Sequence, residues 1–253
     1  MKPFFYALLA LIMLQSCSSK KQLFYVQDLS NNENLTLPFS ESLIQPNDIL
    51  KITVGALVPE TAIPYNQSTS VGGNSSSVES MKLNGYLVSQ ELTINFPQLG
   101  EVTVSQKTTS QLEKYLKNKL ITEGHLNTPT VSVRLLNSKF TVLGEVNNPG
   151  TFDYSENRLT LLQAIGIAGD LNLQGRRDNI VMIREINSKR TVTNIDLTKT
   201  DWLQTDWNYI RPNDVIIVNP NNSKVKSAGF IGNLGTLISV ISILLSTTLL
   251  LIR

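Results

Sequence analysis

Residues 139–170, KFTVLGEVNNPGTFDYSENRLTLLQAIGIAGD, decide the fold of the second half of this chain. Apolar residues and glycine occupy every second position from Phe140 to Gly144, and this period of two predicts a strand. Further along, Thr160 is a candidate N-cap for a short apolar helix, and Gly169 suits the left-handed conformation that ends one. The stretch therefore predicts a strand followed by a helix.

Between the strand and the helix lies the tripeptide Asn148-Pro149-Gly150. Pro149 fixes φ at the first central position of a turn and Gly150 accepts a positive φ at the second, so a type II turn is expected, with a short strand over 151–154 after it. No nucleophile, general base or metal ligand is built into this unit. We interpret it as a module for binding or assembly.

The composition excludes several classes of function. Charged residues make up 17% of the 253 residues and the net charge is +2, which gives no reason to expect a nucleic-acid partner. A single cysteine excludes an internal disulfide framework and cysteine-rich metal sites. A single histidine, His125, argues against most hydrolytic triads and zinc sites. We therefore expect neither a cofactor nor a metal ion.

The N-terminus has the features of an export signal. Lys2 is followed by an apolar run over 4–14 that ends in Leu-Gln-Ser-Cys17. This pattern is similar to a bacterial lipoprotein signal over 1–16, with cleavage before Cys17 and acylation of its thiol, although Gln15 departs from the usual residue type. The alternative is an ordinary secretory peptide or a short membrane anchor in which Cys17 is incidental. Acylation would anchor the chain to a membrane without spanning it.

The C-terminal run over 227–252 contains no charged residue and predicts a transmembrane helix, since it is long enough to cross roughly 30 Å of hydrocarbon. Small or weakly polar residues recur along one face of it: Gly232, Thr236, Ser239, Ser242 and Ser246. This face either packs one helix on another as in a tail anchor or lines the interface of a ring of helices. The sequence leaves both interpretations open.

A short motif, I-x-P-N-D, occurs twice in the chain. The two copies contain Pro46, Asn47 and Asp48, and Pro212, Asn213 and Asp214. Proline fixes the turn, asparagine tolerates the left-handed conformation, and aspartate hydrogen-bonds its own turn backbone. We therefore favour structural turns before strands over carboxylates that bind a ligand.

The rest of the first half predicts strands, a polar loop and one helix. Residues 66–80 are almost entirely Ser, Thr, Asn, Gln and Gly and predict a mobile surface loop, and Pro97 and Gly100 mark a turn between short strands. A helix is expected to begin at a capping box formed by Ser110 and Glu113. This separation of strands and helices favours an α+β fold.

These motifs carry a resemblance to a known family. V-x-G-x-V-x-x-P-G-x-F, followed by L-T-L-L-x-A-I-x-x-A-G, resembles the SLBB module, a β-grasp-like domain of bacterial polysaccharide export proteins. P-N-D-I-L-K-I, I-x-F-P-x-L-G-x-V-x-V and P-x-V-S-V resemble the polysaccharide export domain of the Wza-like family. The chain departs from that pattern in having asparagine for glycine in both P-x-D turns, Gln106 where a glycine is usual, and room for one SLBB module.

The resemblance implies a domain order and a function. The expected order is a signal peptide over 1–16, a linker over 17–40, an export domain over 41–137, an SLBB domain over 138–222, and the C-terminal helix over 227–252. Within the linker, the polar composition of residues 22–40 predicts a segment that wraps the first domain. The implied function is that of a subunit in an outer-membrane ring that exports capsular or extracellular polysaccharide from the periplasm. Its implied partners are other copies of the chain, an inner-membrane polysaccharide co-polymerase, the polysaccharide cargo, and lipid contacted by the acylated Cys17 and the C-terminal helix.

Two alternatives belong to other classes of protein. A monomeric periplasmic glycan-binding lipoprotein would use the C-terminal helix as an anchor and would stack sugar on Trp202, Trp207 and Tyr209, although such aromatic residues more often pack in a core. A glycan-modifying enzyme would need two facing carboxylates. None of the available acidic residues lies in a recognisable catalytic motif: Glu91, Glu101, Asp153, Asp170 and Asp196.

Overall fold

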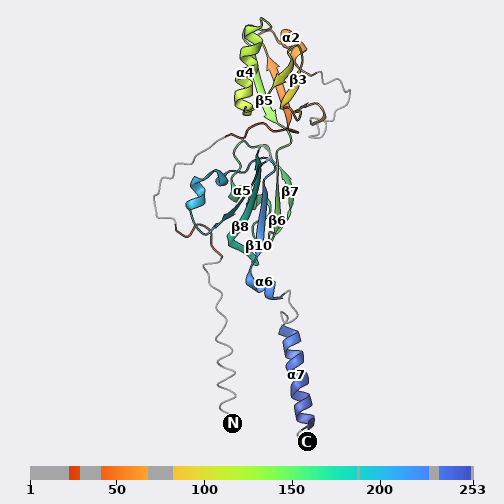
Figure 1. Ribbon diagram of the computed structural model, residues 1–253, viewed down its shortest axis with the longest axis vertical. Coiled ribbons are helices and arrows are strands. Elements are labelled where there is room, and N and C mark those ends of the chain that lie inside the picture. The colour runs from red at the N-terminus through yellow and green to blue at the C-terminus, as the bar shows by residue number, and fades with distance from the viewer. Residues whose placement is uncertain (1–22, 29–40, 68–81, 187–188, 228–233, 252–253) are drawn as a thin grey trace.

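The computed structural model describes residues 23–28, 41–67, 82–186, 189–227 and 234–251. The predicted signal peptide, Cys17, most of the polar loop over 66–80, and Gly232 lie outside these residues. The described chain forms two α+β units, one above the other in Figure 1, followed by two helices. The predicted α+β class is confirmed.

The first unit is built on a three-stranded antiparallel sheet of order β2-β1-β5. Its strands are β1 (Ile49–Gly55), β2 (Tyr86–Leu87) and β5 (Thr130–Leu135). A hairpin of β3 (Thr93–Phe96) and β4 (Gly100–Thr103), the long helix α4 (Thr109–Thr122), and the short helices α2 (Pro59–Ala62) and η2 (Ile63–Tyr65) complete it. Leu112, Leu116 and Leu120 of α4 are fully buried in the core of this unit.

The second unit is a five-stranded sheet of order β7-β6-β10-β8-β9. In chain order its elements are β6 (Lys139–Gly144), β7 (Gly150–Asp153), α5 (Leu161–Ile167), β8 (Gly175–Ile186), β9 (Lys189–Ile195), η3 (Asp201–Gln204), η4 (Asp206–Asn208) and β10 (Val215–Pro220). Only the β6–β10 pairing is parallel. The helices α6 (Asn222–Ser227) and α7 (Leu234–Leu251) extend beyond this unit (Figure 1).

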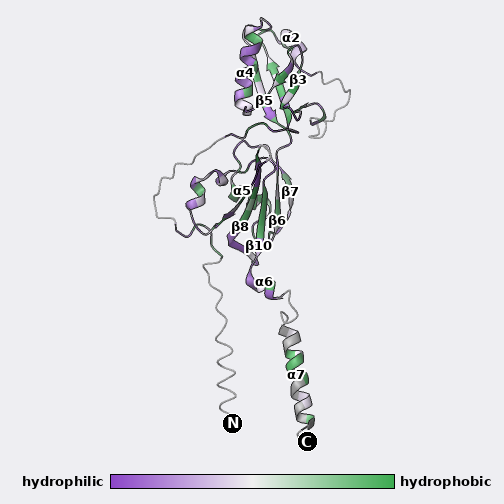
Figure 2. Ribbon diagram, viewed as in Figure 1, coloured by the Kyte–Doolittle hydropathy of each residue, from purple (hydrophilic) through white to green (hydrophobic). Residues whose placement is uncertain are grey.

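Each unit has its own apolar core. The cluster around α4 contains residues 44–133, and the cluster around α5 contains residues 140–218, with no buried residue in common. In the second sheet, Phe140, Val142, Ile180, Met182 and Ile216 point into the core, as the period of two requires. Figure 2 shows the resulting apolar strand interiors and the polar outer side of α4.

The helix ends follow the sequence signals closely. The Thr160 hydroxyl accepts a hydrogen bond from the amide of Gln163, whose side chain accepts one from the amide of Thr160, so α5 begins at a full capping box. Gly169 has φ +79° just beyond the C-terminus of α5, and Gly124 has φ +76° beyond α4. Gly169 is left-handed as predicted, and Gly124 ends α4 in the same conformation.

The predicted type II turn at Gly150 is wrong. Gly150 starts β7 and pairs with Val142 in the antiparallel ladder, which requires extended backbone. The positive φ of this region is at Gly144, with φ +90°, where a Cβ atom would lie 2.1 Å from the carbonyl oxygen of Val218. Gly144 is therefore needed both for its conformation and for the close approach of β10.

The predicted start of α4 is also wrong, by two residues. Its capping box is formed by Thr108 and Gln111. Ser110 donates a hydrogen bond to Glu41 over 2.8 Å, and Glu113 accepts one from the amide of Val133 over 2.8 Å. Both residues of the predicted box serve tertiary contacts instead, one to the chain before β1 and one to β5.

The described part of the N-terminal linker lies on the second unit, so the expectation that it wraps the first domain is wrong for residues 23–28. The amides of Val26 and Gln27 donate to the carbonyls of Leu197 and Thr198 over 3.0 and 2.7 Å. The Tyr25 hydroxyl donates to Asp170. We call residues 23–28 the N-terminal strap.

Of the stretch over 227–252 that was expected to form one C-terminal helix, the structure describes Ser227, the last residue of α6, and the 18-residue helix α7 (Leu234–Leu251). In the described parts of the chain, no helix is both long enough and apolar enough to cross a membrane. Ser239, Ser242 and Ser246 are exposed along α7.

Candidate functional site at the junction of the two domains

The two Pro-Asn-Asp turns flank the point where the chain passes from the first unit to the second. The side chain of Asn137 accepts a hydrogen bond from the amide of Ile49 and donates one to the carbonyl of Asn47, each over 2.9 Å. Two residues on, the carbonyl of Lys139 accepts a bond of 2.7 Å from the amide of Asn213. The connector is thus hydrogen-bonded to both turns.

The two turns have the same backbone geometry. Asn47 and Asn213 have φ +68° and +67°. Asp48 accepts a hydrogen bond from the amide of Gln45, and Asp214 accepts one from the amide of Arg211, each over 2.8 Å. The predicted roles of these residues as structural turns, with left-handed asparagine and self-bonding aspartate, are confirmed.

Asp214 forms a buried ion pair with Arg184. The guanidinium donates from Nε to Oδ1 over 2.9 Å and from Nη2 to Oδ2 over 2.7 Å, and the two side chains are 5% and 0% exposed. Arg184 also donates to the carbonyls of Asp206 and Tyr209. Burial raises the pKa of Asp214, and its contact with Arg184 opposes that rise. This bidentate geometry is that of a strong charge-assisted pair.

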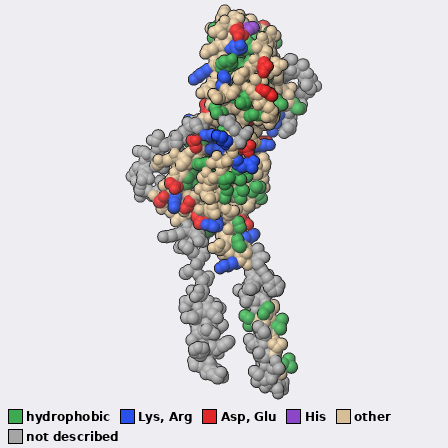
Figure 3. Space-filling model, viewed as in Figure 1, with side chains coloured by type: hydrophobic (Ala, Val, Ile, Leu, Met, Phe, Trp, Pro, Cys, Tyr) green, Lys and Arg blue, Asp and Glu red, His purple; other side chains and the backbone are tan. Residues whose placement is uncertain are grey.

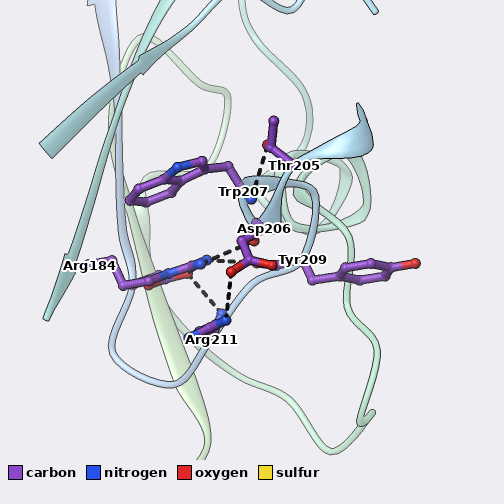
Figure 4. Close-up of polar contacts among 7 residues, drawn as sticks. Arg184, Thr205, Asp206, Trp207, Tyr209 and Arg211 are labelled. Atoms are coloured by element: carbon purple, nitrogen blue, oxygen red, sulfur yellow. Dashed lines mark hydrogen bonds and ion pairs between the residues drawn. The ribbon is translucent and has the colours of Figure 1, made fainter. Parts of the chain in front are cut away.

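The indole ring of Trp207 covers this pair. The guanidinium carbon of Arg184 lies 4.6 Å from the ring centroid of Trp207, and Figure 4 shows the two planes stacked. Asp206 pairs with Arg211 over 3.3 Å, and the Thr205 hydroxyl accepts from the amide of Trp207. One arginine thereby holds the loop after η3 against β8 and the second turn.

Asp48, in the first turn, is also buried, although less completely than Asp214. It is 6% exposed, and burial raises its pKa to about 6. Among the described residues no basic side chain pairs with it. Tyr154, at the end of β7, interacts electrostatically with Asp48, Asp214 and Arg184 and has a pKa raised mainly by burial. The phenol of Tyr154 therefore interacts with the aspartates of both turns.

A cavity of about 480 Å³ opens at the same junction. It is lined by Gln45 from the first unit and by Ile183, Glu185, Arg190, Asn213 and Val215 from the second. Figure 3 shows hydrophobic side chains gathered on the second unit and basic side chains above them, near the first unit. The site thus combines a loop-lined polar rim with an apolar floor.

Sequence reasoning found the turn residues of this site and missed the others. The sequence did contain a sign of the role of Arg184. This residue alternates in step with Ile180 and Met182 along β8, so its side chain lies on the same buried face of the strand. A charged residue on a core-facing position calls for a buried partner. Glu185 and Arg190 are joined by an ion pair of 2.9 Å across the β8–β9 hairpin.

The aromatic residues proposed as a sugar contact do not form one surface. Trp202 is 4% exposed and its Nε1 donates to the carbonyl of Lys199, so it is a core residue with no face free for a sugar. Trp207 lies over Arg184, and the ring of Tyr209 points away from that cluster in Figure 4. None of the three lines the cavity.

The remaining predicted residues lie apart from the cavity. Gly100 is left-handed in the turn that joins β3 to β4 after Pro97, and Pro149 precedes β7. Of the acidic residues considered for catalysis, Asp153 pairs with Lys82 over 3.5 Å, Asp170 accepts from Tyr25, and Asp196 accepts from Thr198. These three carboxylates have structural contacts of their own.

Comparison with protein families identifies both units. Residues 38–136 match the polysaccharide biosynthesis/export protein family, and residues 139–196 match the SLBB domain. Both are families of transport and binding proteins. The boundary between the two matches coincides with the connector that bonds to both turns.

The order of these domains is informative. A polysaccharide export domain followed by an SLBB domain matches the domain architecture of the Wza-like polysaccharide export proteins. Proteins of the export family are associated with the periplasm and with export through the outer membrane.

Proposed function

We propose that this chain is a subunit of an oligomeric channel that exports capsular or extracellular polysaccharide from the periplasm through the outer membrane. The observation that carries the proposal is the export domain joined to an SLBB domain through a connector bonded to both. We assign the two domains to residues 41–137 and 138–222. The partner that supplies the polymer is an inner-membrane co-polymerase.

One face of the SLBB sheet that no described residue covers supports self-association. Strand residues that alternate with the core-facing set lie on this face, beside the junction cavity, and are partly or fully exposed: Thr141, Leu143, Val181, Val192 and Ile217. A row of aliphatic side chains across several strands is costly to leave in water. Packing against a neighbouring subunit in a ring would cover it.

Both ends of the chain supply attachment to the membrane in this proposal. Acylation of Cys17 anchors the subunit in the outer membrane. The apolar segment over 227–252 associates with lipid or with the same segment of neighbouring subunits, and its small face, which includes Thr236, Ser239 and Ser242, allows close helix packing.

The deciding experiment is electron microscopy of the full-length acylated protein, extracted in mild detergent from isolated outer membranes. We expect closed rings with an axial cavity, and we expect cells that lack the chain to retain polymer in the periplasm. Cys17→Ser should shift the protein out of the outer-membrane fraction. Monomers combined with normal export would refute the proposal and favour the monomeric glycan-binding lipoprotein.

A further inference from the structure

The junction cavity presents two amide side chains that bond to nothing in the described parts of the chain. Gln45 and Asn213 line it from opposite domains, and their hydrogen bonds in the structure are made by backbone amides. A primary amide has two donor hydrogens and an acceptor oxygen. The cavity rim therefore offers both kinds of hydrogen-bonding group, held in place by the two turns.

The floor and the remaining wall differ in character. Ile183 and Val215 are neighbours across the β8–β10 ladder and form an aliphatic floor. Glu185 and Arg190 form the wall, where the carboxylate accepts and the guanidinium donates. At about 480 Å³ the cavity falls within the ordinary size range of small-molecule sites.

We propose that this cavity is a subsite for one uncharged sugar unit of the exported polymer. A pyranose ring carries hydroxyl groups that both donate and accept around its edge and an aliphatic C–H face. The amides and the Glu185–Arg190 pair match the edge, and the Ile183–Val215 floor matches the face. Because the two charges of the wall neutralise each other, the site gives no net attraction to an anionic sugar.

The inference rests on the proposed export function, and it specifies which residues of a subunit contact the exported polysaccharide. Gln45 comes from the export domain and the other lining residues come from the SLBB domain. A sugar bound here bridges the two domains beside their connector. Binding should therefore also slow hydrogen exchange at the amide of Asn213, which bonds to Lys139.

The test uses the full-length acylated protein in detergent and isothermal titration calorimetry. The probes are short oligosaccharides released by partial acid hydrolysis of the polysaccharide made by the same cells, separated by anion exchange into neutral and acidic pools. The wild-type protein should bind the neutral pool. Gln45→Ala combined with Asn213→Gly should weaken that binding by about tenfold or more, as expected for two lost hydrogen bonds.

The twin turn supplies the matched control. Glycine keeps the left-handed backbone at either asparagine, so Asn213→Gly removes only the amide. Asn47→Gly makes the same change in the first turn, outside the cavity lining, and should leave the affinity unchanged. Glu185→Gln leaves Arg190 unpaired and should raise affinity for the acidic pool.

The outcomes separate this inference from the function on which it rests. Absence of binding to the neutral pool, equal binding by the double variant, or binding of the acidic pool alone by the wild type would each overturn the subsite. These results would leave the export proposal standing if cells that lack the chain still retain polymer. Normal export in such cells would overturn the proposed function itself.

Discussion

The two Pro-Asn-Asp turns are built alike and are electrostatically different. Both place an asparagine at φ near +68° and both bury an aspartate that accepts a 2.8 Å bond from its own turn. Asp214 meets Arg184 in a bidentate pair, whereas Asp48 has no basic partner among the described residues. The comparison teaches that a turn motif specifies backbone geometry, while the charge state of its aspartate depends on a residue elsewhere in the chain.

The largest expected change in stability comes from a substitution in the second turn. Asp214→Asn keeps an acceptor for the Arg211 amide but leaves the buried Arg184 without its counter-charge, so the SLBB domain should lose about 3–5 kcal/mol of stability. Both tryptophans of the chain, Trp202 and Trp207, are in that domain, so denaturant unfolding followed by tryptophan fluorescence reports it directly. A loss below about 1 kcal/mol would contradict the importance of the pair.

The same aspartate-to-asparagine substitution in the first turn should stabilise its domain rather than destabilise it. The pKa of Asp48 is raised from 3.8 to about 6, so its contribution to stability is fully present below about pH 4 and is lost as the pH rises through about 6. Asp48→Asn removes that dependence and should stabilise the export domain by about 1–3 kcal/mol at pH 8. Hydrogen exchange of export-domain peptides at pH 4 and pH 8 measures it.

Two results would contradict this prediction. If Asp48→Asn is destabilising at pH 8, the carboxylate has a favourable partner in its charged form. If the wild type and the variant differ equally at pH 4 and pH 8, then Asp48 does not titrate in that interval. In either case the electrostatic difference between the two turns would disappear.

The smallest expected effect tests what the turns share. Asn47→Ala and Asn213→Ala should each cost about 1–2 kcal/mol, because alanine is strained in the left-handed region. The costs at the two positions should agree, in contrast to the opposite signs at the aspartates. Thermal unfolding should be measured for both alanine variants and for the corresponding glycine variants, which carry no such strain. A different loss of stability at the two positions would contradict the prediction.

Local structure was the most predictable part of this protein. The left-handed asparagines, the Thr160 cap and the glycines that end α4 and α5 depend on neighbours within a few residues, which the sequence displays. The type II turn failed because Gly150 joins a ladder with Val142. The start of α4 failed because Glu113 is needed by the amide of Val133. In both cases a tertiary partner overrode a local signal.

The candidate site was less predictable for the same reason. Arg184 and Asp214 are 30 residues apart, and the cavity takes residues from both domains. Gln45 and Asn213 become neighbours of one cavity only because the connector bonds to both turns. Resemblance to a family supplied the domain order. The pairing of Asp214 with Arg184, and the lack of a basic partner for Asp48 among the described residues, depend on the tertiary structure and could not be predicted from the sequence.

The N-terminal strap limits the distance between the SLBB domain and the proposed lipid on Cys17. Val26 and Gln27 are bonded to residues 197 and 198, and Tyr25 to Asp170, so the chain is held to the SLBB domain from about Leu23 onward. Five residues lie between Cys17 and Leu23, and the six Cα-to-Cα steps of that stretch reach about 20 Å when the chain is fully extended. If Cys17 is acylated as proposed, the SLBB domain stays within about 20 Å of the membrane surface while the strap remains in place.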